Sequence, residues 1–269
     1  MSTTPEKTVV EFAVGYTEAH LSPVPIGCNG DKLPAFGVLP RGEDGKAEWG
    51  SLQKAIATPE QIHQMFGGRQ EVGVGIVGGA VSGNLSILDV DNLELWEPYR
   101  KLVDEQAPGL LDRLPTVGSP RPGRHVYYRT SEPARGSTKL AQRPYVDEET
   151  GKKKRKTLIE IKAEGGYCVC PGGPLKVHDT GRPYRHVSGP PITEPPVISA
   201  EEQEILWDAA RSFNEYFPEP EQPKGETRRE KAERSGETLG LMPGDDFNER
   251  STWEDIVVPH GWTKEPTHE

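Results

Sequence analysis

Residues 85–92 read Leu-Ser-Ile-Leu-Asp-Val-Asp-Asn, a short apolar run that ends in two carboxylates. The run predicts a β-strand, and side chains two residues apart on a strand point to the same face. Asp89 and Asp91 therefore offer two carboxylates on one side. Hard divalent cations such as Mg²⁺ take oxygen ligands of this kind, often together with substrate phosphates. The same pattern also fits an acidic turn in which Asn92 caps the next helix, so the pair alone leaves both interpretations open.

Glu160 supplies a third carboxylate further along the chain. It lies in Leu-Ile-Glu-Ile-Lys and alternates with Ile159 and Ile161, so a strand here directs the carboxylate away from its apolar side. Two metal ions held by carboxylates are a recurring device of phosphoryl transfer. The residues alone thus predict a metal-dependent nucleotidyl-transfer site at Asp89, Asp91 and Glu160.

His125 follows a loop rich in glycine, proline and arginine. The loop reads Ser-Pro-Arg-Pro-Gly-Arg from residue 119 and runs into a predicted strand at 125–129. Such a loop can bring backbone N–H groups, guanidinium groups and an imidazole onto phosphates. A lone histidine is more often structural, so His125 gains its weight from lying between the two acidic segments.

Helix and strand signals alternate along most of the chain. Thr58 and Gln61 form a capping box around Pro59, which predicts the start of a helix, and Gly67 predicts its end. The expected helices are 59–66, 93–105 and 199–216, and the expected strands are 72–77, 85–90, 125–129, 157–162 and 166–170.

Residues 73–78, Gly-Val-Gly-Ile-Val-Gly, match the Gly-x-Gly-x-x-Gly fingerprint of dinucleotide sites. That fingerprint has physical meaning only between a strand and a helix. Here the glycines lie within a strand pattern and another strand follows, which argues against a dinucleotide site.

Composition predicts a core and a loosely ordered remainder. Only 33% of the 269 residues are hydrophobic, and the chain has 30 glycines and 26 prolines, too many for a wholly compact fold. We therefore expect one core of about 200 residues. The formal net charge of −10 argues against binding nucleic acid over the whole surface, but it allows a local basic channel.

The run Lys152, Lys153, Lys154, Arg155 and Lys156 is the densest basic segment. Its simplest interpretation is a solvated hairpin tip, and the sharper alternative is a contact to template or primer. A nuclear-localisation signal matches the pattern equally well but has no other support in the chain.

Cys28, Cys168 and Cys170 lack the spacing of a zinc site, and the last two are interpreted as small apolar residues on one strand face. No apolar run approaches the roughly 20 residues of a membrane helix. The N-terminus also lacks the apolar region of a secretory signal. We therefore expect a cytoplasmic protein with no membrane partner and no zinc.

Taken in order, the motifs resemble those of the primase–polymerase (prim-pol) branch of the archaeo-eukaryotic primase superfamily, found in phage and plasmid replication proteins. Asp89-Val-Asp91 is similar to the first motif, and residues 119–128 are similar to the second. Residues 158–171, with Gly-Gly-Tyr-Cys-Val-Cys-Pro at their end, resemble the third. The resemblance covers roughly residues 10–190. The chain departs from it at Glu160, where many relatives carry aspartate, and at Pro122, where glycine is common.

The resemblance implies an RRM-like α+β core, with an antiparallel sheet backed by helices and a smaller N-terminal α/β subdomain. It implies primer synthesis or extension on single-stranded DNA from nucleoside triphosphates, with two Mg²⁺ or Mn²⁺ ions on the three carboxylates. His125, with Ser119 and Arg124, would bind incoming phosphates, and Lys32 and Lys162 are further phosphate candidates. The expected location is the cytoplasm of a bacterial or phage-infected cell.

The chain is expected to divide into five segments: a disordered N-terminus at 1–9, a catalytic domain at 10–197, a helix at 198–217, a linker at 218–240 and a C-terminal segment at 241–269. The last is similar to segments that join primase to helicase in phage replication proteins. A replicative helicase, in cis or in trans, is therefore the expected partner.

Three other functions use parts of the same pattern. A metal-dependent nuclease also needs carboxylates and metal ions, but it consumes DNA without nucleoside triphosphates. A nucleotide-sugar transferase uses an Asp-x-Asp motif to bind a metal on a diphosphate. A non-catalytic module would bind single strands through aromatic residues and the basic run at 152–156, and it would survive loss of Asp89.

Overall fold

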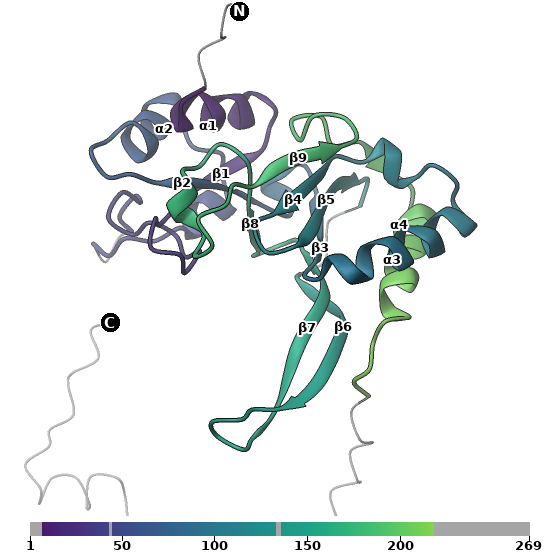
Figure 1. The fold of residues 1–269 in the computed structure, drawn as a ribbon. Helices are drawn as coiled ribbons and strands as arrows, with labels where there is room; N and C mark the ends of the chain where they lie inside the picture. Colours follow the sequence, from purple (N-terminus) through teal and green to yellow (C-terminus); the bar gives the residue numbers. More distant parts are fainter. Residues whose placement is uncertain (1–6, 43–44, 133–135, 218–269) are drawn as a thin grey trace, which may run out of the picture. The chain divides into compact units, whose positions relative to one another are not determined.

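The computed structural model describes residues 7–42, 45–132 and 136–217 (Figure 1). The helices are α1 Val9–Glu18, α2 Pro59–Phe66, α3 Leu93–Gln106 and α4 Ala200–Arg211, with 3₁₀ helices at Gly50–Gln53, Ala80–Ser82, Leu111–Arg113 and Leu175–Val177. The strands are β1 Ser22–Ile26, β2 Gly73–Val77, β3 Leu85–Val90, β4 Thr116–Ser119, β5 Gly123–Thr130, β6 Thr138–Val146, β7 Lys153–Lys162, β8 Tyr167–Val169, β9 Arg185–Ser188 and β10 Val197–Ile198. None of these helices is long and apolar enough to cross a membrane.

The strands form two sheets. The large sheet has the strand order β6-β7-β3-β5-β4-β9, and the small sheet has the order β1-β2-β8. Neighbouring strands in both orders are antiparallel, and β10 adds a short parallel pairing to the end of β5. With helices packed on these sheets, the fold is α+β, which confirms the predicted fold class.

The large sheet buries apolar side chains on both faces because its central strands alternate. On β3, Ile87 belongs to one buried cluster and Leu88 to another; on β5, Tyr127 and Tyr128 divide in the same way. The helices α3 and α4 cover one face, where Trp207 Nε1 donates a 2.9 Å hydrogen bond to the Tyr128 hydroxyl. Side chains of α1, α2 and the small sheet form the cluster on the other face. A catalytic site on the large sheet therefore has to lie where one of these apolar faces ends.

Strand β1 was not predicted, because Ser-Pro-Val-Pro-Ile carries two prolines. Proline cannot donate to a β-ladder, so within sheets it is confined to edge strands and similar positions. β1 is such an edge strand: it pairs only with β2 within the small sheet, and all five of its residues are buried. The short strands β4, β9 and β10, the longer strand β6 and helix α1 were also not predicted.

Two segment boundaries differ from the prediction. Helix α1 begins at Val9, within the segment expected to be disordered, because Thr8 and Glu11 form a capping box. Helix α4 ends at Arg211 rather than near residue 216. The chain then pairs with the edge of β6, where Gln142 N donates to Asn214 Oδ1 and Glu215 N donates to Gln142 O, both at 2.9 Å. The expected linker 218–240 and C-terminal segment 241–269 lie outside the described residues.

The capping box of α2 is formed as predicted: Thr58 Oγ1 accepts from Gln61 N, and Gln61 Oε1 accepts from Thr58 N. We expect Thr58→Ala to lower the free energy of unfolding by about 1 kcal/mol, because a backbone N–H loses its acceptor. Urea unfolding followed by circular dichroism measures this change. Thr58→Ser keeps the hydroxyl and should stay close to wild type; equal losses in both variants would contradict the capping argument.

The hairpin of β6 and β7 extends well beyond the rest of the large sheet (Figure 1). We call its outer part, residues 142–157, the arm. The basic run was interpreted as a hairpin tip, but four of its residues lie in strand β7 and the turn falls at 147–152. Asp147 makes that turn by accepting hydrogen bonds from Thr150, and Gly151 adopts a φ of 64°.

Candidate active site

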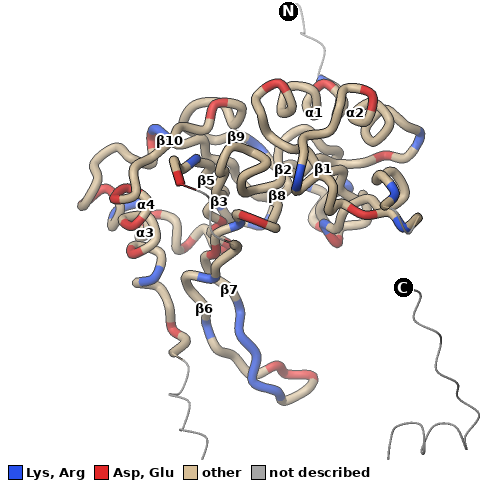
Figure 2. Tube along the Cα trace, turned by 180° about the vertical axis from the view of Figure 1, so that it is seen from behind, with Lys and Arg blue, Asp and Glu red and all other residues tan. Residues whose placement is uncertain are grey.

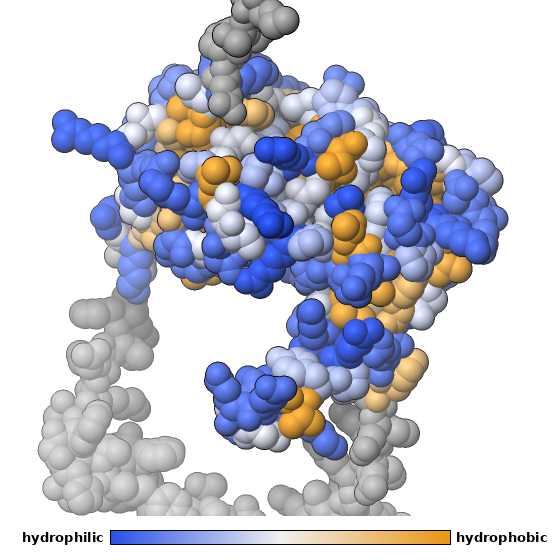
Figure 3. Space-filling view, in the orientation of Figure 1, coloured by the Kyte–Doolittle hydropathy of each residue, from blue (hydrophilic) through white to orange (hydrophobic). Residues whose placement is uncertain are grey.

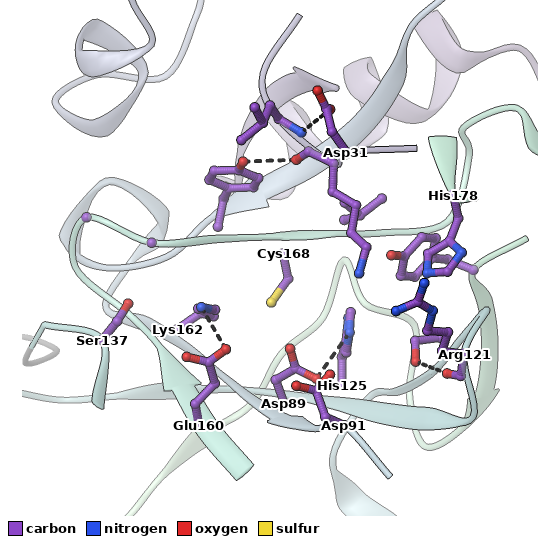
Figure 4. Close-up of a pocket in the computed structure, with 18 of the residues that line it drawn as sticks. Asp31, Asp89, Asp91, Arg121, His125, Ser137, Glu160, Lys162, Cys168 and His178 are labelled. Carbon is purple, nitrogen blue, oxygen red and sulfur yellow. Dashed lines mark hydrogen bonds and ion pairs between the residues drawn. The ribbon is translucent and has the colours of Figure 1, made fainter. Parts of the chain in front are cut away.

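Three predicted site residues form one row across three neighbouring strands. Asp89 on β3 is paired in register with His125 on β5 and with Glu160 on β7. Residues paired across antiparallel strands project to the same face, so these three side chains lie side by side. The preceding residue on that face of β3, Ile87, belongs to the apolar cluster. The row therefore lies where the apolar face gives way to polar side chains (Figure 4).

The row opens into a cleft of about 600 Å³ between the two sheets. Asp91, directly after β3, also lines it and lies beside Asp89 (Figure 4). Strand β8 of the small sheet contributes Tyr167, Cys168 and Val169. The remaining lining residues are Asp31, Lys32, Leu33, Ser119, Arg121, Ser137, Lys156, Lys162, Gly165, Gly166, His178 and Tyr184.

Two carboxyl groups in the cleft have raised pKa values. Burial, reinforced by the charge of Glu160, raises the pKa of Asp89 to about 7. Burial, then the charges of Asp89 and Glu160, raises the pKa of Asp91 to about 6. Lys162 Nζ lies 2.8 Å from Glu160 Oε1, but no described side chain forms an ion pair or hydrogen bond with the Asp91 carboxylate.

This donor set fits hard divalent cations. The oxygen atoms of Asp89, Asp91 and Glu160 are the ligands that Mg²⁺ and Mn²⁺ prefer. A bound cation would favour the ionised carboxylates against the burial and repulsion that raise the two aspartate pKa values. One neighbour has different chemistry: ligand atoms of Asp89, His125 and Cys168 all lie within 4.8 Å of one another. A thiol is not a ligand that Mg²⁺ takes, so Cys168 contributes a buried wall here, as its interpretation as a small apolar residue predicts.

His125 is 6% exposed, and its Nε2 lies 3.5 Å from Asp89 Oδ1. Burial is the main reason that its pKa falls to about 4, so the imidazole is neutral near pH 7. A neutral imidazole carries one N–H donor and one acceptor. The ring of Tyr184 lies 5.7 Å from that of His125 and restricts its orientation. His125 therefore supplies no positive charge beside Asp89 near pH 7.

Basic groups stand around the carboxylates. Lys32 comes from the loop after β1, Lys162 from the end of β7, and Arg121 from the loop between β4 and β5. Lys32 has a left-handed backbone with φ 62°, which is costly for a residue with a Cβ and is held here by neighbours. Its carbonyl accepts a 2.9 Å hydrogen bond from the Tyr167 hydroxyl. The cleft therefore has an acidic floor and a basic rim.

The Gly165-Gly166 turn brings β8 close to the large sheet. Gly165 has φ 74°, and a Cβ on Gly166 would lie only 2.5 Å from Ser137 Oγ. Gly166 O also accepts a 2.9 Å hydrogen bond from Gly78 N, which joins the turn to the end of β2. Any other residue at 166 would displace Ser137 from the cleft wall.

Except for Arg124, the structure separates the predicted site residues into two groups. Those that line the cleft are Lys32, Asp89, Asp91, Ser119, His125, Lys156, Glu160 and Lys162. Four others, Lys152, Lys153, Lys154 and Arg155, lie on the arm.

Arg124, predicted to bind phosphate, points away from the cleft. It precedes His125 on β5, so strand alternation sends it to the opposite face, where its guanidinium lies 5.9 Å from the centre of the Trp96 ring. Arg121 of the same loop lines the cleft instead and pairs with Asp179. Strand alternation, applied to the sequence, would have predicted that Arg121 and Arg124 lie on opposite faces. No local pattern marks His178 or Tyr184, which reach the cleft from distant parts of the chain.

Comparison with known proteins shows the family of this chain. A protein-family model named Prim-Pol, described as the N-terminal domain of bifunctional DNA primase/polymerases, matches residues 13–199. That match spans more than half of the chain and includes every residue that lines the cleft. A search of curated proteins found no match. The chain therefore belongs to the Prim-Pol family of DNA primase/polymerases.

Proposed function

We propose that this chain makes or extends primers on single-stranded DNA from nucleoside triphosphates by two-metal nucleotidyl transfer. The observation that carries the proposal is the row of Asp89, His125 and Glu160 on three neighbouring strands, at the floor of a cleft with a basic rim. A volume of about 600 Å³ lies within the range of small-molecule sites.

Asp89, Asp91 and Glu160 would hold two Mg²⁺ or Mn²⁺ ions. When bound, such ions lower the pKa of the attacking 3′-hydroxyl and neutralise charge on the leaving pyrophosphate. The backbone register that places Asp89 between its two neighbours fixes the carboxylates in advance, so little reorganisation is needed when substrate arrives.

The phosphates of the incoming nucleotide would lie against the basic rim. Lys32 and Lys162 supply point charges, and the Arg121 guanidinium supplies a planar set of donors. His125, neutral and fixed beside Asp89, would donate a hydrogen bond to a phosphate oxygen without repelling the metal ions. Ser119 would act indirectly: its Oγ donates a 2.5 Å hydrogen bond to Arg121 O and so stabilises the loop that carries Arg121.

The two arginines of the loop offer a matched test of this assignment. Arg121→Ala should raise the KM for nucleoside triphosphate by about tenfold or more with a smaller effect on kcat, because a charged hydrogen bond to phosphate is lost. Arg124→Ala, on the opposite face of β5, should leave that KM within about twofold of wild type. Steady-state incorporation at saturating template measures both. Equal effects of the two variants would refute the assignment of Arg121.

The proposed function is tested by nucleotide incorporation on single-stranded DNA with Mg²⁺ or Mn²⁺, with and without a primer. Product without a primer, absent in Asp89→Asn/Asp91→Asn, would establish priming as well as polymerisation. Product only with a primer would restrict the activity to extension. Degraded template without dependence on nucleoside triphosphates would point to a nuclease, and folded protein that yields no product would contradict the proposal.

We also propose a replicative helicase, in cis or in trans, as the natural partner. Its support is the similarity of residues 243–262 to segments that join primase to helicase in phage replication proteins. Analytical ultracentrifugation of the chain with the replicative helicase from the same replicon would test this. Independent sedimentation of the two proteins at micromolar concentration would contradict a helicase partner in trans.

A further inference from the structure

The arm, residues 142–157, takes no part in the site described above except at its base. There Lys156 lines the cleft. From Lys156 outward, basic residues follow one another along β7 almost to the turn (Figure 2). The surface of the arm is mainly hydrophilic (Figure 3), and the formal charge of the whole chain is −10. A concentrated basic strip on an acidic protein marks a place where a polyanion can bind.

The register of the arm shows which side chains lie together. Lys156 pairs with Arg143, and Lys154 pairs with Tyr145, so these four side chains share one face of the two-stranded ribbon. We call it the Tyr145 face. Because Lys156 also lines the cleft, this face runs from the cleft edge toward the turn without interruption. It combines three cations with an aromatic ring that is 45% exposed.

The groups on the Tyr145 face are accessible to a ligand. Lys156 makes no ion pair with any described residue, and the ring of Tyr145 contacts no other described aromatic ring. Lys154 pairs with Asp147 and Arg143 with Glu215, but the two cations are each about half exposed. Arg143 makes three hydrogen bonds to Glu215, but salt screens charges at the surface, so phosphates can compete with the carboxylates for both cations.

The opposite face of the arm is less suited to such a ligand. Its members are Pro144, Val146, Lys153 and Arg155, and the Arg155 guanidinium already lies 4.6 Å from the centre of the Tyr216 ring. Lys153 is therefore a close match for Lys154 in type and position along the strand, but it projects to the other side. The two lysines allow the face to be tested separately from total charge.

We propose that the Tyr145 face binds single-stranded DNA as it enters the cleft, with phosphates on Arg143, Lys154 and Lys156 and a base stacked on Tyr145. Cations along a backbone combined with aromatic stacking is the general means by which proteins bind single strands without sequence preference. The identification of this strand as the template rests on the proposed function. Binding of single-stranded DNA to the arm does not depend on it.

The proposal is tested with the full chain and a fluorescein-labelled oligodeoxynucleotide, by anisotropy without nucleotide or metal. Lys154→Ala/Lys156→Ala should weaken binding about tenfold or more and reduce the slope of log K against log salt by about one to two. Tyr145→Ala should weaken binding about fivefold or more with an unchanged slope. Lys153→Ala should change affinity by less than about threefold. All four positions are exposed, and thermal melting confirms folding.

Two outcomes would overturn the proposal: wild-type affinity in the Lys154/Lys156 double variant, or a loss of affinity in Lys153→Ala as large as in a matched single variant, Lys154→Ala, measured beside it. The synthesis assay separates this failure from that of the proposed function. If wild type incorporates nucleotides but the arm variants bind DNA normally, only the arm is excluded. If the arm variants lose DNA binding and wild type makes no product, the DNA-binding role of the arm is supported and the proposed polymerase function is contradicted.

Discussion

Asp89→Asn should reduce nucleotide incorporation by about a thousandfold or more, because the proposed metal ligand at the centre of the row is lost. The same change should make the metal-free protein more stable. Both effects come from one cause: Asp89 is held among like charges in a buried place, and only a cation makes that arrangement favourable.

The sign of the stability change follows from the pKa. Asp89 has a folded pKa of about 7 against an ordinary value of 3.8, so the folded state binds a proton more tightly than the unfolded chain. Its charge therefore costs stability as pH rises from about 4 to about 7, and the full cost is present above that range. Asparagine carries no charge, so Asp89→Asn should raise the free energy of unfolding near pH 8 by about 1–3 kcal/mol.

Differential scanning fluorimetry in EDTA near pH 8 measures the change, with incorporation assayed on the same samples. Asp112→Asn is the control, because Asp112 is an exposed aspartate paired with Arg100 far from the cleft. It should leave both activity and melting temperature close to wild type. A lower melting temperature for metal-free Asp89→Asn would show that the carboxylate is satisfied by the protein alone.

Mn²⁺ should bind about ten- to twentyfold more weakly near pH 6 than near pH 8. Metal binding requires ionised carboxyls, and the pKa values of Asp89 and Asp91 are about 7 and about 6. Protonation over this range accounts for about tenfold at Asp89 and about twofold at Asp91. His125, with a pKa of about 4, stays neutral throughout and makes no contribution.

Electron paramagnetic resonance of free Mn²⁺ measures this binding without substrate or turnover. Circular dichroism at both pH values shows that the protein remains folded. In Asp91→Asn the weakening toward pH 6 should be smaller, because one titrating group is gone, while Asp89→Asn should bind little Mn²⁺ at either pH. An affinity for wild type that does not change with pH would contradict the raised pKa values.

The central strands could be predicted because polar and apolar residues alternate along them with the two-residue period of a strand. Asp89 and Glu160 alternate with apolar neighbours, and that alternation, which needs no distant information, placed both carboxylates on the polar side. The same rule was not applied to Arg124, whose position next to His125 sends it to the other face. The strand alternation around His125 was therefore sufficient to place Arg124 on the opposite face, although the prediction did not use it.

Other parts of the cleft depend on contacts between distant segments. Tyr184 reaches His125 across 59 positions of the chain, and nothing near it in sequence indicates such a neighbour. Strand β1 was hard to predict because it contains two prolines, which are tolerated only because it lies at a sheet edge. The arm was recognised as basic, but its length depends on the pairing of β6 with β7, and β6 has a weak strand pattern.

Because Asp89, His125 and Glu160 are neighbours through backbone pairing, the chemistry of this enzyme is tied to the registration of its central strands. A slip of β3 by one residue would turn Asp89 toward α3 and α4 and put Leu88 into the cleft. Burying an unpaired carboxylate there is costly, so misregistered chains are disfavoured by the same residue that we propose for catalysis. The acidic motif thus disfavours misregistered folds in addition to its proposed role as a metal ligand, and few folded but inactive copies are expected from this source.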